Sequence, residues 1–251
     1  KLETNMKNFL DEVEGRVKSY KDEEEMRKAA ADFMLSSTKP KYCYNFSWQS
    51  RPIIQYPQDM VAMQEIIWKV KPDLIIEMGI AHGGSLIYNA SILAMLDMCE
   101  AIKEHRIIDP KISERKILGV DIDIREHNKT EIEKHPMSSR IEMIEGSSIS
   151  PEIIGKVKDY AKDYKCILLS LDSNHTHEHV LAELEDYDRE RFLKVLPSDV
   201  IAKKFIDEMD SDDAADVLND LPENIKQEVL QNLTDVEQAG DIVDLLNYHE
   251  D

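Results

Sequence analysis

The segment Leu74-Ile-Ile-Glu-Met-Gly-Ile-Ala-His-Gly-Gly-Ser85 decides the fold. It joins an apolar run that ends in an acidic residue to a glycine-bearing turn, and a helical pattern follows Ser85. Glycines let the backbone approach a ligand closely, and a helix N-terminus offers unpaired N–H donors. Ligands bind at this carboxyl end of a strand in an open parallel sheet. The segment therefore predicts a ligand-binding turn, with an ordinary strand-to-helix turn as the alternative. Its spacing departs from Gly-x-Gly-x-x-Gly, which argues against a dinucleotide.

Apolar runs and helical patterns alternate after this segment. Such alternation is typical of right-handed βαβ units and a parallel sheet. The fold class predicted for residues 1–186 is therefore α/β, with two more helices before the sheet, over Leu2–Met34 and Pro57–Val70. The predicted strands are Leu74–Met78, Ile117–Ile122, Ile141–Ile144 and Cys166–Leu171, and the helices between them are Ser85–Glu104, Arg125–Lys134 and Pro151–Asp163.

The charge balance excludes polyanionic partners. The 251 residues carry 31 basic and 51 acidic side chains, a formal net charge of −20. Nucleic acids and anionic membrane surfaces repel such a chain. The longest uncharged stretch, Met78 to Leu96, contains a glycine pair and polar residues, so we expect no membrane insertion. Three cysteines without metal or redox spacing, and no apolar signal core in Lys1 to Tyr20, indicate a cytoplasmic protein.

The last 65 residues differ in composition from the rest. Residues 187–251 carry 18 acidic and 6 basic side chains, and no strand pattern occurs in them. Helix-start signals recur every 12 or 13 residues, which predicts short helices stacked as a small all-α superhelical segment. We therefore predict two abutting domains, 1–186 and 187–251. The repeated starts lie at Leu196, Met209, Leu221 and Leu233.

Polar residues follow three of the other predicted strands. A carboxylate at Asp121 or Asp123 is placed to accept the two hydroxyls of a ribose, and strand alternation predicts that one of them faces the ligand. The small polar run ending in Ser147 and Ser148 leaves room for a purine ring. Asp172, after the last strand, is suited to hold a divalent cation or to act as a base.

Three histidines follow Asp172. His175, His177 and His179 are the right residue type for a metal site, but the expected change from strand to helix near Thr176 separates them. We favour helix-start polar residues for His177 and His179.

Several of these motifs, in the same order, resemble the cephalosporin hydroxylase family, which is similar to rhamnosyl O-methyltransferases. The resemblance covers about residues 6–186 and implies a Rossmann-like S-adenosylmethionine methyltransferase fold. The motifs are Asn45-Phe-Ser-Trp, Arg51-Pro-Ile-Ile-Gln-Tyr-Pro-Gln-Asp, Ile76-Glu-Met-Gly-Ile-Ala-His-Gly-Gly-Ser, Gly119-Val-Asp-Ile-Asp-Ile-Arg, Ile144-Glu-Gly-Ser-Ser and Leu171-Asp-Ser-Asn-His.

The resemblance assigns roles to these residues. It implies S-adenosylmethionine as the cofactor, with Asp121 or Asp123 on its ribose. Asp172 becomes one ligand of a Mg²⁺-type ion, and His175 a neighbouring candidate for the substrate proton. The methionine part of the cofactor would lie against Glu77, Gly79, Gly83 and Ser85, and the adenine near Ser147 and Ser148.

The tail resembles the intracellular N-terminal domain of MgtE-type magnesium transporters over about residues 189–251. Met209-Asp-Ser-Asp-Asp-Ala-Ala-Asp and the Leu-Pro helix starts carry this resemblance. It implies a superhelix of short helices that senses Mg²⁺ in the full transporter. A solvated acidic face is the favoured reading of these aspartates.

The function expected is O-methyl transfer to a small molecule or sugar. Four strands are predicted, whereas the fold implied by the resemblance has about seven. The sequence therefore leaves open whether the protein catalyses the reaction. An uncovered sheet edge favours a homo-oligomer. An iron-dependent hydroxylase would need two histidines and a carboxylate, and we find no convincing pair. The alternatives are a cofactor-binding or Mg²⁺-sensing module without turnover, and an inactive chimera of two partial domains.

Overall fold

Four parallel strands form the centre of the protein. The computed structural model describes all residues except 1, 175, 185–191, 195, 220 and 249–251. In it, β3 (Leu74–Met78), β4 (Lys116–Asp121), β5 (Ile141–Glu145) and β6 (Ile167–Leu171) lie in the order β5-β4-β3-β6. Leu74 pairs with Lys116 on one side and with Ile167 on the other. The α/β, Rossmann-like prediction is confirmed, and the carboxyl end of β3 lies between those of β4 and β6.

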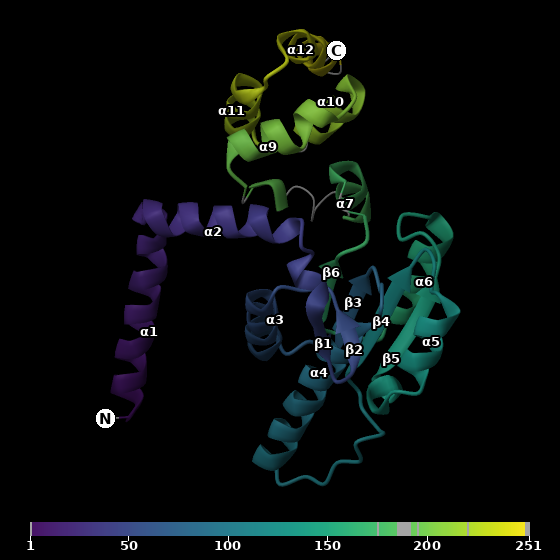
Figure 1. Cartoon of the computed structure of the whole chain (residues 1–251). Helices are drawn as coiled ribbons and strands as arrows, with labels where there is room; N and C mark the ends of the chain where they lie inside the picture. The colour runs from purple at the N-terminus through teal and green to yellow at the C-terminus, as the bar shows by residue number, and fades with distance from the viewer. Residues whose placement is uncertain (1, 175, 185–191, 195, 220, 249–251) are drawn as a thin grey trace.

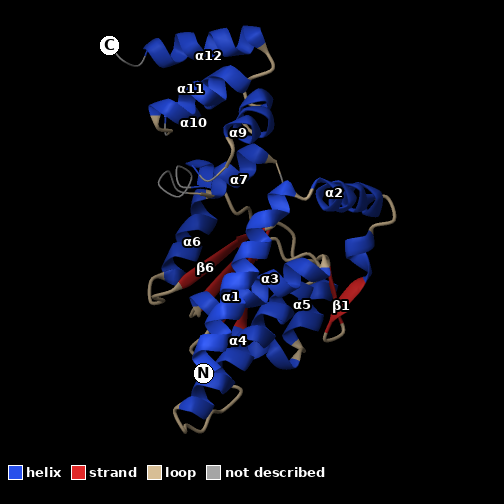
Figure 2. Ribbon diagram, turned by 90° about the vertical axis from the view of Figure 1, so that its left-hand side faces the viewer, coloured by secondary structure: helices blue, strands red, loops and turns tan. Residues whose placement is uncertain are grey.

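Helices cover both faces of this sheet, as Figures 1 and 2 show. On one face, α3 (Pro57–Val70), α4 (Gly84–Lys103) and α5 (Glu126–Glu133) pack against Ile75 and Ile117. On the other, α6 (Pro151–Ala161) packs against Leu74 and Ile76. Successive strand residues point to opposite faces, so the fully buried β3, which is apolar except for Glu77, supplies both cores.

Helix α4 is the core helix of the domain. Among the described residues, it is the one helix long and apolar enough to cross a membrane, with a mean hydropathy of 1.3. However, 56% of this apolar window is buried inside the protein, as expected of a helix that packs between a sheet and its neighbours.

The N-terminal segment is two helices where the sequence predicted one. α1 (Leu2–Ser19) and α2 (Glu24–Thr38) are separated by a 3-10 turn at Tyr20–Asp22, and they extend away from the sheet at an angle to each other (Figure 1).

The aromatic segment that follows contains a hairpin that the sequence did not predict. After a 3-10 turn at Tyr42–Asn45, β1 (Phe46–Trp48) pairs antiparallel with β2 (Arg51–Ile53). The indole Nε1 of Trp48 donates to Ser91 Oγ on α4 at 2.9 Å. Phe46 and Trp48 pack against the core of the domain.

The tail is helical, as predicted. α9 (Ser198–Lys204), α10 (Ser211–Asn219), α11 (Glu223–Asn232) and α12 (Val236–Tyr248) surround their own apolar cluster, with a 3-10 turn at Ile206–Glu208. This cluster includes Leu181 from α7 (His177–Glu183), so α7 shares a core with the tail. In Figure 1, α7 lies between the sheet and these four helices.

One edge of the sheet is open among the described residues. There, β6 pairs with β3 alone, and its Ile167 and Leu169 side chains are 43% and 41% exposed. Self-association through this edge stays a prediction.

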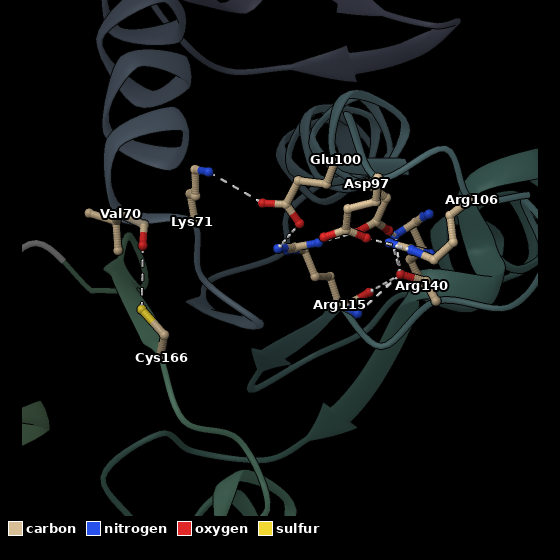
Figure 3. A network of polar contacts seen from close by, with 10 residues as sticks. Val70, Lys71, Asp97, Glu100, Arg106, Arg115, Arg140 and Cys166 are labelled. Carbon is tan, nitrogen blue, oxygen red and sulfur yellow. Dashed lines mark hydrogen bonds and ion pairs between the residues drawn. The ribbon is translucent and has the colours of Figure 1, made fainter. Parts of the chain in front are cut away.

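A polar network fastens the amino-terminal side of the sheet (Figure 3). Asp97 on α4 binds Arg115, which precedes β4, and accepts from Arg140 Nη1 at 2.6 Å, next to β5. Arg115 Nη2 also binds Glu100 Oε2 at 2.8 Å. The network therefore joins one helix to the starts of two strands.

Candidate functional site

A cavity of about 670 Å³ opens at the carboxyl ends of the strands. β3 supplies its turn, β4 supplies Asp121, and the segments after β5 and β6 supply the rest of the floor. One wall comes from the segment around the hairpin, including Cys43, Tyr44 and Tyr56. The site residues predicted from the sequence that line it are Gly79, Ser85, Asp121, Ser147, Ser148 and Asp172.

The Gly79–Gly83 turn is fastened to the end of β4. Asp121 Oδ2 accepts from the backbone N–H of Ile80 at 2.7 Å and of Ala81 at 3.2 Å. Asp121 Oδ1 accepts from the N–H of Asp123 at 3.1 Å. A carboxylate has about four lone-pair sites, so one of them stays open to a ligand.

The structure distinguishes the two candidate aspartates. Asp121 lines the cavity, whereas Asp123 is absent from its wall, with a side chain 73% exposed and 3.9 Å from Arg125 Nε. The reason is not strand alternation, which would put residues two positions apart on the same face. β4 ends at Asp121, so Asp123 lies in the loop that follows.

The two predicted glycines differ in position. Gly79 (φ +96°) lines the cavity, but Gly83 (φ +78°) does not, because it packs against Ile132 of α5. Its role is to start α4 in a conformation that favours glycine.

Glu77 lies beneath the cavity rather than in its wall. It is 2% exposed and borders a smaller adjoining cavity of about 230 Å³. Its carboxylate accepts from Ser85 Oγ, and from Asn89 Nδ2 at 3.0 Å. Burial raises the pKa of Glu77 to about 7, although the hydrogen bonds from Ser85 and Asn89 lower it and the charge of Asp172 raises it further.

We expect the stability of the protein to fall between about pH 4.5 and 7 because of Glu77. A raised folded-state pKa means that the native state holds the proton more tightly than the unfolded state, so this stabilisation is lost as pH rises. The shift corresponds to roughly 3 kcal/mol at most. Urea unfolding across this pH range should show that the unfolding free energy of Glu77→Gln depends less on pH than that of the wild type. The matched variant Glu131→Gln, whose side chain is 55% exposed, should keep the wild-type slope. Equal slopes in all three proteins would contradict the assignment.

His179 is a cavity residue that the sequence reasoning assigned to the helix start. It lines the cavity from α7, and its Nε2 lies 3.0 Å from Ser148 Oγ and 3.3 Å from Glu183 Oε1. Both contacts use the same ring nitrogen, so this is not a relay in which an acid orients His to activate Ser. The contact with Ser148 instead attaches α7 to the segment after β5, and the contact with Glu183 lies within α7.

Asp172 borders both cavities. Its Oδ2 accepts from Gln55 Nε2 at 3.3 Å. His175 lies outside the described residues, so its predicted role stays a prediction. The described residues contain no group of three or more His, Cys, Asp or Glu side chains able to hold a metal ion. That part of the chain does not complete a Mg²⁺ site, and Asp172 as a metal ligand also stays a prediction.

Comparison with known families agrees with this architecture. The family model described as Rhamnosyl O-methyltransferase/CmcI matches residues 40–212, more than half of the chain. The chain belongs to this family. The Rhamnosyl O-methyltransferase/CmcI match runs past residue 187, where we predicted a second domain to begin. That boundary, and the likeness of the tail to MgtE-type transporters, stay predictions.

Individual relatives match the chain in part. The rhamnosyl O-methyltransferases of Mycobacterium bovis and Mycobacterium tuberculosis are each 28% identical over 153 residues, 59% of this chain and 51% of theirs. That of Mycobacterium leprae is 26% identical over 140 residues, 55% of this chain and 52% of its own. The chain thus spans about half the length of these Rhamnosyl O-methyltransferase/CmcI relatives. A solved structure of CmcI with Mg and SAM is 13% identical, with a TM-score of 0.38 over 57% of this chain and 54% of that one.

Proposed function

We propose that the cavity binds S-adenosylmethionine and that the protein transfers its methyl group to a hydroxyl of a small molecule or sugar. One observation carries the proposal: Asp121, the last residue of β4, and Asp172, the first residue after β6, line the same cavity. Rhamnosyl O-methyltransferases among the relatives, and CmcI solved with SAM, support this choice of reaction and cofactor.

The charge of the wall favours a cationic ligand. Two carboxylates, Asp121 and Asp172, border the cavity, and S-adenosylmethionine carries a sulfonium and an ammonium group. Asp121 is suited to accept from one ribose hydroxyl with its remaining lone pair. Ser147 and Ser148 border the space left for the adenine, and Gly79 and Ser85 the space for the methionine part.

The turn after β3 disfavours a phosphate-bearing cofactor. A phosphate-binding loop aims its backbone N–H groups at the ligand, but here those of Ile80 and Ala81 donate to Asp121. The carboxylate also adds negative charge where a pyrophosphate would lie. This supports the choice of S-adenosylmethionine over a dinucleotide.

The chemistry follows from the position of Asp172. The bound cofactor supplies an electrophilic methyl group on a sulfonium. As the acceptor oxygen forms its bond to that carbon, the carbon–sulfur bond breaks and sulfur keeps the electron pair. We assign Asp172 the role of accepting the hydroxyl proton, and Gln55 holds its Oδ2. No step is assigned to Mg²⁺, because the described residues do not complete a site for it.

Calorimetric titration with S-adenosylhomocysteine tests the cofactor site. We expect the wild type to bind it, and Asp121→Asn to weaken binding about tenfold or more, the value of a hydrogen bond to a charged group. Asp123→Asn is the matched control, because that side chain is largely exposed and outside the cavity wall. No binding by the folded wild type, or equal loss in both variants, would contradict the proposal.

A second candidate is a module that binds the cofactor without turnover, because the described sheet has four strands and its β6 edge pairs with β3 alone. Repeating the titration with and without Mg²⁺ separates the two. Binding that Mg²⁺ leaves unchanged, with no methyl transfer to sugar acceptors, would support the module.

A further inference from the structure

The turn between β3 and α4 adopts a backbone that needs support. Gly79, Ala81 and Gly83 have φ angles of +96°, +47° and +78°. Ala81 is not a glycine, so its left-handed conformation is strained and persists only where neighbours hold it. Ala81 and His82 both line the cavity, so the shape of this turn sets part of the binding wall.

Arg51 holds this turn from the hairpin. Its Nε donates to the carbonyl of His82 at 3.1 Å, and its Nη2 donates to the same oxygen. Nη2 also donates to Asn128 Oδ1 at 3.1 Å. A planar guanidinium presents several donors in a fixed fork, so one side chain makes all three contacts.

Asn128 holds the turn from α5. It is 3% exposed, and its Nδ2 donates to the carbonyl of Ala81 at 2.9 Å. The contact from Arg51 to Oδ1 fixes which end of the amide faces Ala81. Since Asp121 accepts from the N–H of Ala81, this residue is fastened at both its N–H and its carbonyl.

We propose that Arg51 and Asn128 form a clasp that preorganises the cofactor-binding turn, acting as positioning residues for cofactor binding. This rests on the function proposed above. Neither side chain is among those that line the cavity, whereas Ala81 and His82, whose carbonyls they bind, both are. The clasp therefore acts through the turn and not by touching the ligand. It also makes cofactor affinity depend on the hairpin, which lies outside the βαβ units.

Two conservative variants test the clasp. Arg51→Lys keeps the charge but replaces the planar fork, which donates to His82 through both Nε and Nη2, with a single ammonium nitrogen. Asn128→Asp keeps an acceptor for Arg51 but removes the donor to Ala81. We expect each to raise the Kd for S-adenosylhomocysteine about tenfold, the value of one hydrogen bond. Because both residues act on one turn, the Kd of the double variant should rise by much less than the product of the two single increases.

The control is Arg125→Lys. Arg125 lies at the start of α5, close to Asn128, and its side chain pairs with the exposed Asp123 rather than with the turn. It should leave the Kd unchanged. Urea midpoints for all variants show whether affinity changes exceed any general loss of stability.

Hydrogen exchange supplies a readout that needs no ligand. The amides of Ile80 and Ala81 should exchange faster in Arg51→Lys and Asn128→Asp than in the wild type, and not in Arg125→Lys. If the wild type binds S-adenosylhomocysteine and the Arg51 and Asn128 variants have the same Kd and the same hydrogen exchange, the clasp alone is overturned. A folded wild type that does not bind would overturn the proposed function and the clasp with it.

Discussion

Gly79→Ala should cost about 4 kcal/mol of unfolding free energy and abolish cofactor binding. Gly79 combines φ +96° with close contact to the end of β6, and a Cβ there would lie 2.7 Å from the carbonyl carbon of Asp172 and 3.0 Å from Ser173 Cα. Left-handed strain and overpacking each contribute about 1–3 kcal/mol. The neighbouring atoms are backbone, so they move only if the strand end moves.

That displacement would change the cavity. The N–H of Asp172 donates to Met78 at 2.8 Å, and the N–H of Gly79 donates to Val120 at 2.7 Å, so the ends of three strands meet at this point. Pushing β6 away from β3 would separate Asp172 from the turn. We therefore expect affinity for S-adenosylhomocysteine to fall even in the folded fraction.

Gly155→Ala is the matched control. Gly155 lies within α6, and an added Cβ would meet nothing within 4 Å. Replacing a helical glycine by alanine should stabilise the protein by about 0.5–1 kcal/mol. Urea unfolding and calorimetry on both variants check the pair. Equal stability of Gly79→Ala and the wild type would contradict the packing at this strand end.

The sheet was predictable because its strands are mainly apolar. These apolar runs placed all four strands to within about one residue of their ends, and the two central strands, β3 and β4, are largely buried, as expected of strands covered by helices on both faces. The hairpin was not predictable in this way. Its strands are three residues each, and Gln49 and Ser50 form the turn with positive φ angles, without the Asn-Gly signal typical of such turns.

The candidate site was predictable where it follows a strand end. Asp121 ends β4, Asp172 directly follows β6, and Ser147 and Ser148 lie within three residues of the end of β5. Parallel topology brings these strand ends together. The contacts that support the site were not predictable. Arg51 reaches His82 across 31 residues and Asn128 across 77, and no local pattern encodes such a pairing. His179 was interpreted as a helix-start residue because its partner Ser148 lies 31 positions away.

Asp97→Ala should lower the unfolding free energy by about 3–5 kcal/mol, the usual result of removing one partner from a buried ion pair. The Arg140 side chain is 4% exposed, and those of Asp97 and Arg115 are 15% and 17% exposed. Burial alone would raise the pKa of Asp97, but hydrogen bonds from Arg140, Arg115 and Ser113 outweigh it and hold the pKa below its ordinary value. Without this carboxylate, two guanidinium groups lose a shared acceptor (Figure 3).

An exposed pair gives the comparison for Asp97. Asp32 binds Lys28 at 2.7 Å, but the two side chains are 61% and 77% exposed, so Asp32→Ala should change stability by less than about 1 kcal/mol. The two variants also differ with pH. A carboxyl whose pKa is lower in the folded state stabilises the protein at pH values above its unfolded-state pKa, and this stabilisation is lost as pH falls. The difference in unfolding free energy between wild type and Asp97→Ala should therefore become smaller in acid. Urea unfolding at neutral and acidic pH measures this. A difference in unfolding free energy that is small at neutral pH, or that becomes larger in acid, would mean that the carboxylate does not hold α4 to the strand starts.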